Sequence, residues 1–213
     1  LLWAHRWNLS SKTVKINNKR VWDYTFQPES QVLVKTLCHE MFHALGAPDL
    51  YHYDENVFTP VGAWDIMESG AGHMGAYMKW KYADAKWITS IPEITLSGAY
   101  NLNPLTASTN NCYKIASPNS SKEFFILEYR SQVGIYEINL PGSGLLVYRI
   151  NTDCYGNANF DNNSVFDEVY VYRQGGTMTV NGSTSDAYFT SDVGRTSIND
   201  VTDPKCFLHN GLP

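Results

Sequence analysis

Residues 39–49 carry two histidines, a glutamate and an aspartate in the order His39, Glu40, His43 and Asp49. On an α-helix, residues four apart lie about one turn along the axis and on nearly the same side, so the two imidazoles can converge on one metal ion. Glu40 projects about 100° further round the helix, where it can reach a metal-bound water without binding the metal. The spacing therefore predicts a zinc site, with His39 and His43 as ligands and Glu40 as general base.

The third ligand must come from outside the helix. A catalytic zinc ion takes three protein ligands and keeps its fourth position for water. Gly46 can turn the chain sharply in a left-handed conformation and carry Asp49 back toward the histidines. Asp49 is thus the predicted third ligand, with His52 and Asp54 as near competitors. A polar helix face would explain two histidines alone, but the glutamate, glycine and aspartate at these offsets favour a metal site.

The segment Gly62-Ala63-Trp64-Asp65-Ile66-Met67 suggests a second part of the site. Metzincin proteases place a methionine in a tight turn beneath the zinc, where its soft side chain fills the floor under the histidine rings. We predict such a Met-turn at Met67, with an ordinary core methionine as the alternative. Asp65 and Glu68 are candidates to orient a ligand imidazole, although Asp65 can equally cap the local turn.

Taken in order, these segments resemble the immune inhibitor A type metalloproteases, peptidase family M6. The similarity covers residues 2–7, 22–25, 39–51, 64–70, 85–88, 124–130 and 140–146. It implies a secreted, zinc-dependent endopeptidase that acts on protein or peptide substrates, is made with a propeptide and often carries calcium. Two positions depart from the family pattern. Phe42 stands where relatives more often carry glycine, and no tyrosine follows Met67 at the second position, where some metzincins stabilise the transition state.

His73 and Tyr77 are therefore the candidates for transition-state support, because both follow the predicted Met-turn. A histidine in a glycine-rich stretch is more often an ordinary surface residue, and this stays the alternative for His73. In the expected mechanism, zinc lowers the pKa of its bound water to about 7. Glu40 takes a proton as that water attacks a peptide carbonyl, and then passes the proton to the leaving amine.

A cluster of acidic and amide residues is the candidate for a calcium site, since hard cations prefer several oxygen ligands. Its members are Asp153, Asn157, Asp161, Asn163, Asp167 and Glu168. Their spacing matches no known calcium loop. A solvated turn between two strands is the favoured interpretation.

Composition indicates a folded globular protein. The chain has 213 residues, of which 43% are hydrophobic and 14% aromatic, enough to bury a sizeable core. A formal net charge of −5 argues against nucleic acid or an anionic membrane surface as the partner. No apolar run approaches the length of a membrane span. The chain begins at Leu1 without a leader, so we expect a processed product. The sequence does not indicate an oligomeric state.

The predicted fold class is α+β, with a zincin-like core over residues 1–90 and a β-rich region over residues 91–213. In the core we expect strands, an active-site helix over residues 31–45 capped by Ser30, the Met-turn near residue 67 and a second helix over about residues 75–85. The helix is predicted to bury an apolar stripe made of Leu33, Leu37, Met41 and Leu45.

Strands are predicted wherever β-branched and aromatic residues lie between turn residues. They cover residues 2–9, 21–27, 93–100, 112–116, 123–130, 144–150 and 168–173. Two strands before the active-site helix are fewer than zinc proteases of this kind place there. We therefore expect part of the N-terminal subdomain to be missing or to lie on a separate polypeptide.

The four cysteines permit three complete pairings, and none has metal-ligand spacing. Cys38 is predicted to be a small buried hydrophobe on the helix. Among Cys112, Cys154 and Cys206, a disulfide between Cys154 and Cys206 is the expected one.

Two other functions compete with a zinc endopeptidase. One is a catalytically silent M6-like domain that only binds a partner, but it has no need for Glu40. The other is an adhesion or carbohydrate-binding module in the β-rich half, with tyrosines that fit ordinary sheet packing at least as well as a sugar platform.

Overall fold

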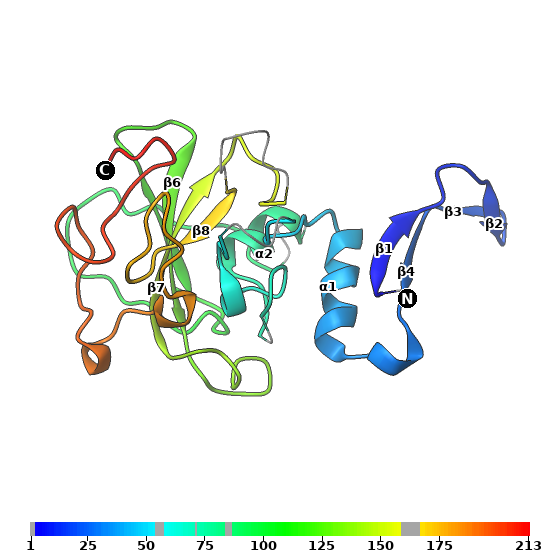
Figure 1. The fold of residues 1–213 in the computed structure, drawn as a ribbon, viewed down its shortest axis with the longest axis horizontal. Helices are drawn as coiled ribbons and strands as arrows, with labels where there is room; N and C mark the ends of the chain where they lie inside the picture. Colours follow the sequence, from blue (N-terminus) through cyan, green and yellow to red (C-terminus); the bar gives the residue numbers. More distant parts are fainter. Residues whose placement is uncertain (1–2, 54–57, 71, 84–86, 159–166) are drawn as a thin grey trace. The chain divides into compact units, whose positions relative to one another are not determined.

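The computed structural model describes residues 3–53, 58–70, 72–83, 87–158 and 167–213 (Figure 1). In those residues the protein has the predicted mixed α+β character, with two α-helices, several 3-10 helices and three antiparallel sheets. The chain divides into two compact units, Leu1–Ala47 and Pro48–Pro213. A zincin-like core and a domain division near residue 90 remain predictions.

The smaller unit begins with two antiparallel strand pairs. Strand β1, His5–Asn8, pairs with β4, Asp23–Phe26, and β2, Val14–Ile16, pairs with β3, Lys19–Val21. The turn between β2 and β3 has positive φ at both Asn17 and Asn18, the arrangement of a two-residue hairpin loop. The single strand predicted over residues 21–27 is therefore replaced by the end of β3 and the whole of β4.

Helix α1 runs over Val34–Ala44, within the predicted range of residues 31–45. It starts late because Glu29–Gln31 form a separate 3-10 helix and Leu33 is extended, with no side chain capping the helix. The predicted cap by Ser30 is thus wrong. At the other end, Gly46 has a φ of +99°. Its N–H donates to the backbone carbonyl of His43, and the N–H of Ala47 donates to the backbone carbonyl of Phe42. This Schellman motif turns the chain as predicted.

The predicted buried stripe of α1 is wrong. Leu33, Met41 and Leu45 are more than half exposed, at 55%, 56% and 54%. The buried side chains of the helix are Glu40 and Phe42. The physical reason is the small size of β1 and β4, four residues each, which contact α1 but are too short to cover an apolar helix face.

The larger unit is built on a four-stranded antiparallel sheet in the order β5-β6-β7-β8. Strands β6, β7 and β8 are labelled in Figure 1. Its strands are Cys112–Ala116, Glu123–Arg130, Gly144–Asn151 and Val169–Val171. Each lies within or next to a predicted strand, and β7 is buried along nearly its whole length. The strand predicted over residues 93–100 is wrong, because this segment makes only an isolated bridge between Glu93 and Lys114.

Helix α2 covers Ala76–Tyr82, inside the predicted second helix, whose expected end falls outside the described residues. The large side chains of Tyr77, Met78 and Tyr82 on this helix are buried. Among the described residues, neither α-helix has the length and apolar character needed to cross a membrane.

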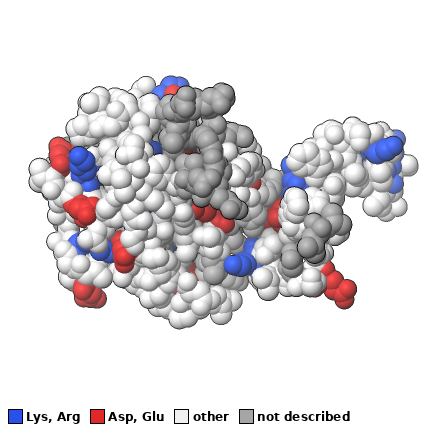
Figure 2. Space-filling model, viewed as in Figure 1, with Lys and Arg blue, Asp and Glu red and all other residues white. Residues whose placement is uncertain are grey.

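Charged side chains of the larger unit lie both on its surface and in its interior. On the face shown in Figure 2, acidic and basic residues are interspersed. Inside, Arg130 donates to Glu137 at 2.7 Å, to Glu128 at 3.1 Å and to the carbonyl of Trp64 at 2.9 Å. Glu128 also accepts from the N–H of Ala76, at 2.6 Å. The buried charges thus join β6, the segment before Met67 and the start of α2.

All four cysteine thiols are free, so the predicted disulfide between Cys154 and Cys206 is wrong. The two thiols have different surroundings: Cys154 lies in the field of Asp167, whereas Cys206 lies in that of Asp200. Burial raises the pKa of each thiol to about 11. Cys38 is exposed, contrary to the prediction that it is buried.

Candidate metal centre

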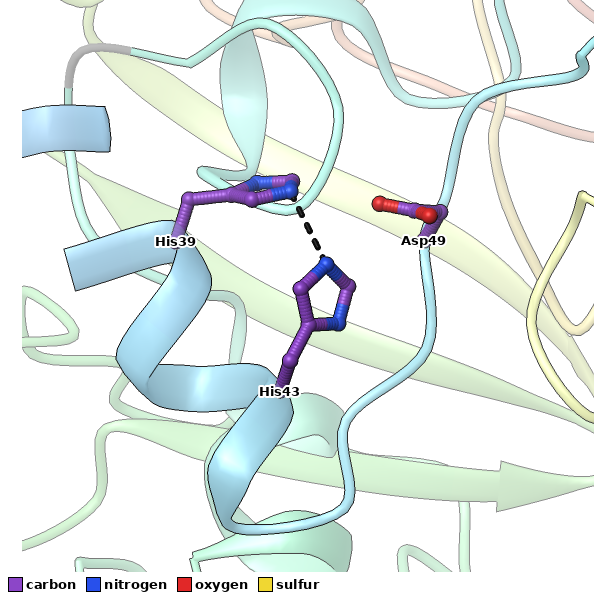
Figure 3. Close-up of side chains that lie close together, drawn as sticks. All are labelled: His39, His43 and Asp49. Carbon is purple, nitrogen blue, oxygen red and sulfur yellow. Dashed lines mark hydrogen bonds between the residues drawn. The ribbon is translucent and has the colours of Figure 1, made fainter. Parts of the chain in front are cut away.

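The structure brings the side chains of His39, His43 and Asp49 together (Figure 3). Both histidines lie in the second half of α1, and Asp49 follows the turn at Gly46. One potential ligand atom from each residue lies within 4.8 Å of the other two. The short stretch 39–49 therefore presents two imidazole nitrogens and one carboxylate oxygen at a single point.

Backbone geometry at the end of α1 orients His43. Its Nδ1 lies 2.7 Å from the carbonyl oxygen of Ala47, so this nitrogen donates and carries the ring proton. Its Nε2 then faces Nε2 of His39 at 3.1 Å. A metal-binding histidine commonly fixes its tautomer in this way, by donating its other ring N–H to a carbonyl. The Schellman turn thus supplies the carbonyl that orients a candidate ligand.

These donors fit a catalytic zinc ion in type and number. Zinc in hydrolases is held by three nitrogen or oxygen ligands, each about 2 Å from the ion, with one position open. Ligand atoms around such an ion are therefore roughly 3–4 Å apart, close to the separations among His39, His43 and Asp49.

Asp49 is held by one hydrogen bond from its own loop and one from a distant segment. The hydroxyl of Tyr53 donates to its Oδ2 at 2.8 Å, and the N–H of Asn157 donates to its backbone oxygen at 2.9 Å. Burial, together with the hydrogen bond to the carboxylate, raises the pKa of Tyr53 to about 12. The hydroxyl of Tyr53 therefore remains a donor to Asp49 at neutral pH.

Glu40 is buried on α1, next to His39, with 7% of its surface exposed. A buried carboxylate beside a candidate ligand is in the sequence position that a general base requires. Its catalytic role remains a prediction.

Of the two competing ligands, His52 does not belong to this cluster. His52 is buried, and its Nε2 lies 2.5 Å from Oδ1 of Asp167. Its side chain is therefore engaged with an acidic partner elsewhere in the larger unit. Asp54 lies outside the described residues.

Met67 is fully buried and is tied to the segment that carries Asp49. The N–H of Leu50 donates to the carbonyl of Met67 at 2.9 Å. Asp65 accepts from the N–H of Met67 at 2.9 Å and from the N–H of Gly75 at 2.8 Å. Burial raises the pKa of this aspartate despite those two bonds. Asp65 thus caps the turn, the second of its two predicted roles, while the Met-turn itself remains a prediction.

Glu68, the other candidate to orient an imidazole, also binds backbone. It accepts from the N–H of Val61 at 2.7 Å and from the N–H of Gly62 at 2.6 Å. Burial raises the pKa of Glu68 to about 8. We therefore assign it to the structure of the loop before Met67.

His73 and Tyr77 are engaged with buried carboxylates. The hydroxyl of Tyr77 donates to Glu168 at 2.9 Å, and Nε2 of His73 lies 2.9 Å from Glu137. Burial acts to raise the pKa of Glu137, but His73 and the charge of Arg130 outweigh it and hold this pKa at about 2. These contacts hold both side chains in the larger unit, and their role in transition-state support remains a prediction.

The predicted calcium cluster gains no support. Asp161 and Asn163 lie outside the described residues. Within the described part, Asp153 pairs with Lys122 at 3.1 Å, and Asn157, Asp167 and Glu168 bind protein groups.

Sequence reasoning missed Tyr53 and Asn157 as residues that support the candidate site. Tyr53 lies four positions after Asp49, and this proximity could have suggested a contact. Asn157 carries no such signal, because it lies 107 positions from Leu50, which it also binds.

In a comparison with known proteins, residues 1–81 match a family of metallopeptidases, and proteins of this family require a metal cofactor and act on proteins. The matching family model is immune inhibitor A peptidase M6, catalytic domain. It confirms the resemblance inferred from the motifs and includes α1, Asp49 and Met67. No significant match was found among curated proteins or among solved structures.

Proposed function

We propose that the protein is a secreted zinc endopeptidase in which His39, His43 and Asp49 hold the metal and Glu40 is the general base. The observation that carries the proposal is the convergence of two imidazoles and one carboxylate within 4.8 Å of one another. The match of residues 1–81 to a metallopeptidase family also supports the proposal. Secretion is inferred from the family alone.

When bound, zinc supplies a Lewis acid and lowers the pKa of water to about 7. The carboxylate of Glu40 takes a proton from the attacking water and delivers it to the nitrogen of the leaving amine. Asp49 adds a negative ligand beside two neutral imidazoles, and Tyr53 holds one of its oxygens by a hydrogen bond. His43 stays in the ligating tautomer because its Nδ1–H donates a hydrogen bond to the carbonyl oxygen of Ala47.

The test compares the natural chain with Glu40→Gln. Glutamine keeps the size of the side chain but cannot accept the proton, so both forms should bind one equivalent of zinc. Cleavage of a denatured protein should fall by about 100-fold or more, the usual contribution of general base catalysis. Metal content by mass spectrometry and cleavage by gel or fluorescence give the two readouts.

Glu29→Gln is the matched control, because Glu29 is an exposed glutamate just before the same helix. It should leave both zinc binding and cleavage unchanged. Equal cleavage by the natural chain and Glu40→Gln would refute the mechanism. Zinc binding without cleavage by the natural chain would instead favour the catalytically silent alternative.

A further inference from the structure

The loop that carries Asp49 is held by a distant part of the chain. Asn157 is fully buried, and its backbone N–H donates to the carbonyl of Asp49 at 2.9 Å. Its side-chain amide donates to the carbonyls of Leu50 and Val169, at 2.9 Å and 2.8 Å, and accepts from the N–H of Val169 at 3.1 Å. Asn157 therefore joins the candidate ligand loop to the first residue of β8.

Gly156 allows the two segments to approach this closely. It has a φ of +70°, and a Cβ atom there would lie 2.5 Å from Cβ of Pro48 and 2.7 Å from the carbonyl oxygen of Asp49. Such distances are shorter than any ordinary contact between these atoms. Glycine is thus required for the backbone of residues 156–157 to lie against the backbone of residues 48–49.

A second contact holds the same loop three residues beyond Asp49. His52 and Asp167, separated by 115 positions in the sequence, form a buried pair at 2.5 Å. The next residue, Glu168, accepts from the hydroxyls of Tyr77 and Tyr82 on α2 and from the N–H of Gly156. Asn157, Asp167 and Glu168 are therefore all held by contacts within the larger unit.

We propose that Asn157 is a positioning residue for the metal centre. By fixing the backbone of Asp49 and Leu50, it keeps the Asp49 carboxylate where the two histidines can share an ion with it. The His52–Asp167 pair limits movement of the same loop. This inference rests on the proposed function, because it assumes that Asp49 is a ligand. It also extends the metal-binding unit well beyond residue 81, where the family match ends.

The test measures zinc affinity in the full chain carrying Asn157→Ala. Groups that orient a metal ligand commonly contribute about 10- to 100-fold to metal affinity, so a loss of this size is expected. Chelator competition gives the affinity. The visible absorption of the Co²⁺ form should also change, because its bands report the geometry of the ligands.

Asn151→Ala is the matched control. Asn151 is also a buried asparagine, but its side chain accepts from the N–H of Asp153 and does not hold the Asp49 loop. In the metal-free state, both Asn151→Ala and Asn157→Ala should be less stable than the natural chain. Asn151→Ala should nevertheless keep the zinc affinity and the Co²⁺ spectrum of the natural chain. Equal losses of zinc affinity in the two variants would overturn the proposal, because they would reflect general destabilisation.

Asp167→Asn provides a second variant if Asn157→Ala does not fold. Asparagine keeps the shape of the side chain but weakens the bond to His52, so a loss of zinc affinity near the lower end of that range, about 10-fold, is expected. Unchanged affinity in the folded variants would overturn the positioning role alone. Absence of zinc binding in the natural chain would instead refute the proposed function.

Discussion

At the scale of single residues, the candidate ligands could be predicted because their relation is local. His39 and His43 lie four apart on a helix, and Gly46 makes the turn that brings Asp49 back. The residues that hold Asp49 in place could not be predicted in the same way. Tyr53 is in contact only because of the conformation of its loop, and Asn157 only because of the tertiary fold.

Tyr53→Phe tests the hydrogen bond to Asp49. Tyr53 is 62% exposed, so the substitution should change the stability of the metal-free protein by only about 0.5 kcal/mol. Zinc affinity should fall by about 10-fold, because the carboxylate loses the donor that orients it. Affinity is measured by chelator competition and stability by thermal unfolding.

Tyr100→Phe is its control, since Tyr100 is also exposed and its hydroxyl donates to the carbonyl of Leu96. This variant should match the natural chain in zinc affinity. If Tyr53→Phe binds zinc normally but cleaves more slowly, its hydroxyl acts on the substrate rather than on Asp49.

At the scale of elements, sequence patterns predicted best where side-chain type and burial agree. Strands β6 and β7 carry runs of β-branched and aromatic residues and lie in the sheet as expected. Helix α1 agreed less well. Its apolar stripe is exposed because the short strands that contact it cannot cover it, and burial of this kind is a property of the neighbours rather than of the helix sequence.

Glu137→Gln tests the buried charges that connect elements of the larger unit. The pKa of Glu137 is held at about 2, below its ordinary value of 4.5. Its stabilisation is therefore complete above about pH 4.5 and is lost as pH falls toward 2. At pH 7 the substitution should cost about 3 kcal/mol, by the linkage between pKa and stability.

Urea unfolding at pH 7, 4.5 and 3 measures both the cost and its pH dependence. The natural chain should lose stability between pH 4.5 and 3 more steeply than Glu137→Gln. Glu93→Gln removes a partly exposed carboxylate that pairs with Lys114, and it should cost less than about 1 kcal/mol. Parallel pH curves for the natural chain and Glu137→Gln would contradict the assignment.

At the scale of the whole molecule, the family match and the candidate metal site have different extents. The match ends at residue 81, within α2, whereas the contacts that hold the Asp49 loop come from Asn157 and Asp167. A short motif can therefore predict the ligands and the class of reaction. It cannot predict the parts of the sequence that position those ligands, because such contacts depend on how distant segments fold together.

Hydrogen exchange with and without zinc tests whether the contacts beyond residue 81 are coupled to metal binding. If the contacts from Asn157 and the metal stabilise the same arrangement of the Asp49 loop, zinc should slow exchange of the Asn157 amide, which donates to the carbonyl of Asp49. At a free zinc concentration 100 times the dissociation constant, binding adds about 2.7 kcal/mol, or roughly 100-fold slower exchange through openings that release the metal. His39→Ala, which lacks a ligand, should show no such change. Protection by zinc of the Ala47 amide but not of the Asn157 amide would show that Asn157 is independent of the metal centre.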